Sequence, residues 1–200
     1  GPFGHFALFE DGVLKDYTRD LGRWRIAELS VKPYPSGRAS HAVLGALAEL
    51  PHREVASVVV HVPPLIRHLV DRPYRSDMTP AYARLCMPFL CALMLTERSI
   101  DPRRFTPDSF ADPALAALAG KVEIRDDGNT DPNAMAPQRV EVEFAGGERT
   151  DISVPVTLGS PARLLDLRQA AAKYGLCRDL APLSCDPRVF DDPLGYLVNT

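Results

Sequence analysis

The sequence predicts an α+β fold with a small antiparallel or mixed sheet packed against helices, and three observations lead to this class. Residues 139–156 hold two alternating segments around a Gly-Gly pair, which predicts a β-hairpin. Two further strands are predicted at 54–62, which is rich in β-branched residues, and at 121–127. Helical segments interleave irregularly with these strands, so the regular alternation of a doubly wound fold is missing.

The helices are predicted from apolar spacing, caps and proline positions. Thr79 is expected to cap the second helix, and Pro88 inside that helix is expected to kink or split it. Asp112 is expected to cap the third helix, and Gly175 is expected to end the last one. The predicted ranges are 38–50, 79–97, 112–120 and 161–174.

Composition restricts the classes of partner. The chain has 200 residues and a net charge of −3, which argues against nucleic acid or an anionic membrane as a partner. Its longest apolar run, residues 85–95, is far shorter than the roughly 20 residues of a membrane span and is predicted to be a buried core helix. The four cysteines form no CxxC motif and no zinc-ligand spacing, which is typical of reduced thiols in a cytoplasmic protein.

The common catalytic and metal-binding signatures are missing from the sequence. There is no GxSxG, no GxGxxG after a strand, no phosphate-binding Walker loop and no HExxH. The stretch "DDGNTD" begins like a calcium loop, but Pro137 occupies the place of the closing glutamate. None of these motifs therefore indicates a metal or an organic cofactor.

The stretch "VKPYPSGRASH", residues 31–41, concentrates cationic and titratable side chains between two prolines and a glycine. A helix beginning near residue 38 would place Arg38 and His41 on one face, since residues three apart are neighbours there. Lys32 and Tyr34 would project to the same side of the extended piece before it. Because a helix N-terminus also favours anions, these groups could converge on one carboxylate ligand. The alternative is that Lys32 and Arg38 are solvated and His41 only makes a core contact.

Four segments, in unbroken order, resemble the MmgE/PrpD family. "KPYPSGRASHAVLGAL" is similar to the family's Lys-x-Tyr-Pro motif with its later histidine, and "ARLCMPFLCALML" is similar to a helix that follows it. "DPALAALAGKVEI" and "RVEVEFAGGERTDISVPVTLGSP" resemble the family's next helix and strand and its hairpin. The resemblance is to the second half of the family. It implies a connector from a missing helical domain at 1–30, an α+β lid-type second domain at 31–175 and an irregular tail at 176–200.

The resemblance implies the C-terminal part of a 2-methylcitrate dehydratase-like lyase. Such an enzyme acts on small di- or tricarboxylic acids by removing a proton α to a carboxylate, without a cofactor. Carried over by position, Lys32 and His41 would be catalytic. The substrate-binding residues would be Tyr34, Ser36, Gly37 and Arg38.

Departures from the family pattern leave the exact reaction open. Gly37 stands where some members have a second histidine, Phe89 where many have tyrosine, and Cys86 where serine is usual. The alternatives are a related cis-aconitate decarboxylase or iminodisuccinate epimerase activity, or a non-catalytic lid-like module for binding or dimerisation.

The expected partners follow from the same resemblance. They are a small carboxylic acid, a helical domain or subunit missing from this chain, and a second copy in a homodimer. Whether the 200-residue chain is active by itself is left open, and a cytoplasmic location is expected.

Overall fold

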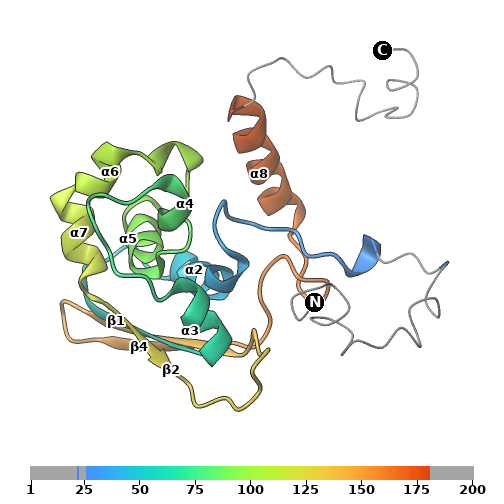
Figure 1. Ribbon diagram of the computed structural model, residues 1–200, viewed down its shortest axis with the longest axis horizontal. Helices are drawn as coiled ribbons and strands as arrows, with labels where there is room; N and C mark the ends of the chain where they lie inside the picture. The colour runs from blue at the N-terminus through green and yellow to red at the C-terminus, as the bar shows by residue number, and fades with distance from the viewer. Residues whose placement is uncertain (1–21, 23–25, 181–200) are drawn as a thin grey trace, which may run out of the picture.

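A four-stranded mixed sheet forms one layer of the protein, seen at the base of the computed structural model in Figure 1. The structure describes residue 22 and residues 26–180, so most of the predicted connector and tail lies outside the described residues. The strand order is β2-β1-β3-β4, with β1 parallel to β2 and the other neighbours antiparallel. The strands are β1 Val55–Val62, β2 Val122–Asp126, β3 Gln138–Phe144 and β4 Arg149–Val154. The predicted α+β class, with its hairpin, is confirmed.

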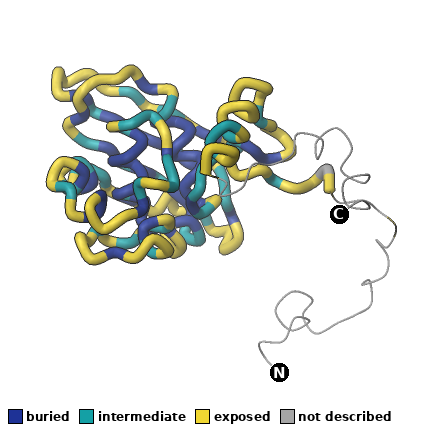
Figure 2. The backbone as a smooth tube through the Cα atoms, turned by 90° about the horizontal axis from the view of Figure 1, so that it is seen from above, coloured by how far each residue is buried: buried dark blue, intermediate teal, exposed yellow. Residues whose placement is uncertain are grey.

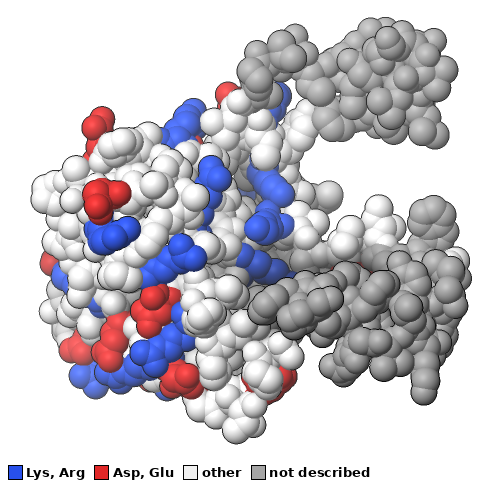
Figure 3. Space-filling model, in the orientation of Figure 1, with Lys and Arg blue, Asp and Glu red and all other residues white. Residues whose placement is uncertain are grey.

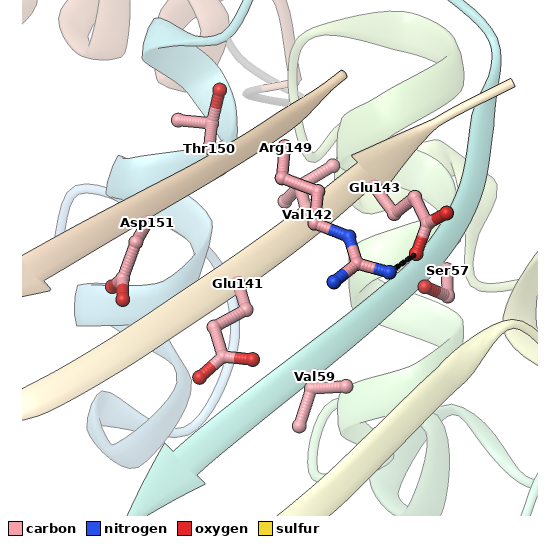
Figure 4. A pocket seen from close by; sticks show the side chains of 8 residues that line it. All are labelled: Ser57, Val59, Glu141, Val142, Glu143, Arg149, Thr150 and Asp151. Atoms are coloured by element: carbon pink, nitrogen blue, oxygen red, sulfur yellow. Dashed lines mark hydrogen bonds and ion pairs between the residues drawn. The ribbon is translucent and has the colours of Figure 1, made fainter. Parts of the chain in front are cut away.

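Alternation along the strands gives the sheet one apolar face. In β1 the buried residues Val58 and Val60 alternate with Ser57 and Val59, which are only partly buried. The second set, together with charged residues of β3 and β4, points away from the helices, and Figure 4 shows the Arg149–Glu143 pair, 3.0 Å apart, on this open face. Because successive side chains of a strand point to opposite faces, this pattern requires helices on one side alone.

Most of the helices form the second layer, on the apolar face of the sheet, whereas α8 stands apart from them (Figure 1). The central helix α5 is buried at Met87 and from Phe89 to Met94, and it packs against α2 and α7. It contains most of the apolar run at 85–95, which confirms that run as a core helix. The helices are α2 His41–Glu49, α3 Pro64–Val70, α4 Pro80–Ala83, α5 Met87–Glu97, α6 Pro107–Ala111, α7 Pro113–Ala119 and α8 Leu167–Leu180.

The predicted split at Pro88 is confirmed, and the break lies just before the proline. Helix α4 ends at Ala83 and α5 begins at Met87, which places Pro88 in the first turn of α5, where a missing N–H costs least. The predicted caps are also confirmed. Thr79 Oγ1 accepts a hydrogen bond from the Tyr82 N–H at 3.3 Å, and Asp112 Oδ1 accepts one from the next helix at 2.8 Å.

The last helix differs from its predicted range of 161–174. It runs from Leu167 to Leu180, so Gly175 lies inside it and the first five residues of the predicted tail are helical. The side chain of Asp166 accepts from the Gln169 N–H at 2.7 Å, and Gln169 Oε1 accepts from the Asp166 N–H at 3.0 Å. This reciprocal cap begins the helix six residues later than Pro161 suggested.

Backbone hydrogen bonds join the segment before α2 to the segment that follows β4. The Val31 N–H donates to the Gly159 carbonyl oxygen at 2.7 Å, and the Gly159 N–H donates to the Arg163 carbonyl at 2.7 Å. Gly159 has φ +86, and a Cβ atom at this residue would lie 1.9 Å from the Val31 carbonyl oxygen. A side chain therefore fits neither the backbone conformation nor the available space.

Replacing Gly159 with alanine is expected to separate these two segments locally. The left-handed conformation costs about 1–2 kcal/mol for a non-glycine residue, and the clash with Val31 adds to it, so the Val31 amide should exchange with solvent faster. Hydrogen-exchange mass spectrometry measures this. Gly147→Ala is the matched control, because Gly147 has φ +81 with no atom within 4 Å of the added Cβ. Unchanged protection of Val31 in Gly159→Ala would contradict the argument.

Candidate active site

Hydrogen bonds within the segment before α2 hold it in one shape. A 3₁₀ turn, Arg38–Ser40, leads directly into α2. Ser40 Oγ donates to the Gly37 carbonyl at 2.8 Å and lies 2.9 Å from Ser36 Oγ. The Gly37 N–H donates to the Arg84 carbonyl at 2.9 Å, which ties the segment to the end of α4. The two predicted ligand contacts Ser36 and Gly37 thus have polar groups bonded within the protein.

Gly37 is also closely packed. A Cβ atom at Gly37 would lie 2.5 Å from Leu85 Cδ2, so the Leu85 side chain occupies the space of any side chain at this position. A histidine there, as in some members of the resembled family, would require Leu85 to move.

His41, the first residue of α2, is the most enclosed of the predicted site residues. Its side chain is 1% exposed, and Nε2 has no hydrogen-bond partner among the described residues. The ring of the half-buried Tyr34 packs edge-on against it, with centroids 5.6 Å apart and an interplanar angle of 84°. Since buried polar atoms are nearly always hydrogen-bonded, this nitrogen is an unsatisfied acceptor in the described part of the chain.

The surroundings of His41 keep its imidazole neutral. Its pKa is lowered from 6.5 to about 4, chiefly because burial disfavours the charged ring. The positive charges of Lys32, Arg38 and Lys173 lower it further, while a hydrogen bond with the Ser36 backbone acts in the opposite direction. At neutral pH the ring therefore offers an acceptor nitrogen rather than a further positive charge.

The three cations around His41 have no acidic partner in the part of the chain that the structure describes. Among the described residues, no ion pair joins Lys32, Arg38 or Lys173 to a carboxylate, and Lys32 Nζ contacts only the Ser36 carbonyl at 3.4 Å. Basic side chains gather on the side of the body that faces α8 (Figure 3). Uncompensated positive charge beside a neutral, enclosed acceptor suits an anion, and a carboxylate in particular.

The structure brings the predicted residues together with one that the sequence did not assign. Lys32 and Arg38 are exposed, and Tyr34 is half-buried with a pKa raised by burial and by Glu49. The addition is Lys173 of α8, which lies more than a hundred residues further along the chain. Only the return of α8 toward the body brings Lys173 close to His41.

The acidic loop that begins like a calcium loop is held by hydrogen bonds within the loop. In the loop after β2, the side chains of Asp126, Asp127, Asn129 and Asp131 each accept a hydrogen bond from a backbone N–H two residues on. No cluster of three metal-ligating side chains occurs in the described part of the chain. Within the same residues, no helix is both long and apolar enough to cross a membrane.

The fold and the site together define a class of module. It is a two-layer α+β domain with a basic site where the segments entering and leaving the body meet. The family model for the MmgE/PrpD C-terminal domain matches residues 34–181, which is most of the chain. The chain therefore belongs to the MmgE/PrpD family and contains its C-terminal domain, which confirms the predicted resemblance. A comparison with curated proteins finds no match.

Proposed function

We propose that the chain supplies the C-terminal part of a 2-methylcitrate dehydratase-like lyase for small di- or tricarboxylic acids. Family membership supports this proposal. The single observation that carries it is His41 Nε2, which has no hydrogen-bond partner among the described residues and lies among three cations without a described acidic partner. A neutral imidazole beside these charges supports the proposal, because it can accept a proton while the charges hold carboxylates.

In the proposed reaction Lys32 and Arg38 bind the substrate carboxylates, and the neutral His41 takes the proton from the carbon α to one of them. The electron pair of the broken C–H bond forms the new C=C bond, and the β C–O bond breaks. The leaving hydroxyl takes a proton, for which the Lys32 ammonium is a donor, and departs as water.

Substrate binding would also activate the base. With a pKa of about 4, free His41 holds a proton weakly. Bound carboxylates offset the charges of Lys32 and Arg38, which raises the His41 pKa and strengthens the base. The same first step could serve an epimerase, and the same cations a decarboxylase, so product analysis separates these reactions.

A helical partner, in this chain or in another subunit, is part of the proposal. Large apolar side chains are exposed on the segment before the body and around the start of α8, and Leu167 is 91% exposed. Exposed apolar surface of this kind suits a protein interface. The same surface supports the second candidate function, a non-catalytic module that binds a partner or a second copy. Its exposed members are Ile26, Leu29, Val31, Leu164 and Leu167.

Binding of tricarballylate, an unreactive tricarboxylate, tests the proposal. Isothermal titration calorimetry is expected to show binding that weakens about tenfold in Lys32→Gln, because one charge contact of about 1.4 kcal/mol is lost. Arg149→Gln is the control, since Arg149 lies on the open face of the sheet, which points away from the helices (Figure 4). An absence of binding, or equal affinity in Lys32→Gln, would overturn the proposal. Alkene formation from 2-methylcitrate, followed by ultraviolet absorbance, then tests the lyase reaction.

A further inference from the structure

We propose that Lys173 supplies a third carboxylate-binding cation to the site, so that α8 is a functional part of it. This inference rests on the proposed function and adds a specificity residue to it. It also makes the position of α8 depend on the bound ligand.

A cavity of ≈ 430 Å³ lies between one face of α8 and the body. The helix lines this cavity with Gln169, Ala172, Lys173 and Leu176, whose spacing of three and four residues defines a single helix face. Tyr34 lines the opposite side, and its ring contacts the His41 ring. The cavity thus extends from the Tyr34 ring, which packs on His41, to α8.

Most polar groups that line the cavity are already engaged. The Arg98 guanidinium donates to carbonyls at the end of α2, and the Asp101 carboxylate binds Arg103. Gln169 Oε1 accepts from the Asp166 N–H. Among the charged side chains of the lining, Lys173 is the one without a hydrogen bond or ion pair to another described residue. Its ammonium group is therefore available to a ligand.

The remaining lining is largely apolar, with side chains such as Ile100, Leu158 and Leu165. An ammonium group at the edge of an apolar cavity is poorly compensated and attracts an anionic group. Lys173 approaches His41 from α8, whereas Lys32 and Arg38 lie on the segment before α2. Cations from separate segments can bind separate carboxylates of one molecule, which favours a tricarboxylate over a dicarboxylate.

Helix α8 has no buried residue, and Figure 2 shows it largely exposed beside the buried centre of the body. Few contacts therefore fix its position, and a ligand held by Lys173 and Lys32 together would tie the helix to the body. Binding is expected to slow amide exchange in α8 as well as in the segment before α2.

Titration calorimetry with tricarballylate and with glutarate, which lacks the middle carboxylate, tests the inference on the full chain. Lys173→Gln is expected to weaken tricarballylate binding five- to tenfold and glutarate binding by less than twofold, while Lys173→Arg should retain most of the affinity. Arg168→Gln is the matched control, because Arg168 lies on the same helix but does not line the cavity. Hydrogen exchange should show ligand protection of α8 in the unsubstituted chain and in Arg168→Gln, but not in Lys173→Gln.

The outcomes separate this inference from the proposed function. If the unsubstituted chain binds tricarballylate and Lys32→Gln weakens that binding, the proposed function stands. If Lys173→Gln then behaves like Arg168→Gln, or if Lys173→Arg is as weak as Lys173→Gln, the inference is overturned. An equal loss for both ligands also contradicts it, because it removes the preference for the third carboxylate. No binding by the unsubstituted chain overturns both.

Discussion

Lowering the pH from 7 to 4 is expected to destabilise the folded chain by about 3 kcal/mol through His41. The folded-state pKa of His41 is about 4, against 6.5 for an unperturbed histidine. Between these two values the unfolded chain binds the proton and the folded chain does not, so stability rises with pH across this window. Each pKa unit corresponds to 1.36 kcal/mol, which gives about 3 kcal/mol for a shift of this size. Above pH 6.5 the contribution is fully present, and it is lost as the pH falls toward 4.

Urea denaturation at several pH values measures this dependence. His41→Gln removes the titrating group, so its stability should change much less between pH 6.5 and 4, whatever its absolute value. His52→Gln, the same substitution at an exposed histidine, is the matched control. If His41→Gln retains the full slope, the proposed environment of His41 is wrong.

Replacing Arg98 with methionine is expected to cost about 3 kcal/mol. Arg98 follows α5, and its guanidinium donates to the carbonyls of Leu47, Ala48 and Leu50 at the end of α2, with the Leu47 contact at 3.0 Å. Hydrogen bonds from a charged donor contribute about 1.5–3 kcal/mol each, and partial exposure of Arg98 reduces the sum. Its loss leaves carbonyls at the helix end without partners and removes a cation from the negative end of the helix dipole.

Two further variants separate the loss of the Arg98 hydrogen bonds from the effect of its backbone conformation and from the loss of an exposed arginine. Arg98 has φ 60, so Arg98→Gly removes the side chain but relieves the left-handed conformation and should be about 1 kcal/mol more stable than Arg98→Met. Arg67→Met is the matched control, because the exposed Arg67–Asp71 pair, 3.0 Å apart, is expected to contribute less than about 1 kcal/mol. Urea denaturation that gives equal losses for Arg98→Met and Arg67→Met would contradict the capping role.

The helix caps and the interruption of a helix were predictable from the sequence. Thr79 and Asp112 cap the helices that follow them, and Pro88 interrupts a helix, because each acts on residues only a few positions away. The range of α8 was predicted wrongly for a related reason. Gly175 resembles a helix stop, but a glycine inside an exposed helix costs only about 1 kcal/mol, and the Asp166–Gln169 cap decides where the helix begins.

The sequence by itself determined the fold class, the family and one half of the candidate site. Lys32, Arg38 and His41 lie within ten residues, and their spacing places them together through local geometry alone. Only the tertiary structure decided that His41 is buried, that its pKa is about 4 and that its Nε2 has no partner among the described residues. The tertiary structure also decided that Leu85 fills the space at Gly37 and that Lys173 joins the cations. Burial and electrostatic interaction depend on distances in space, and these distances are set by how α8 and α4 return to the segment before α2.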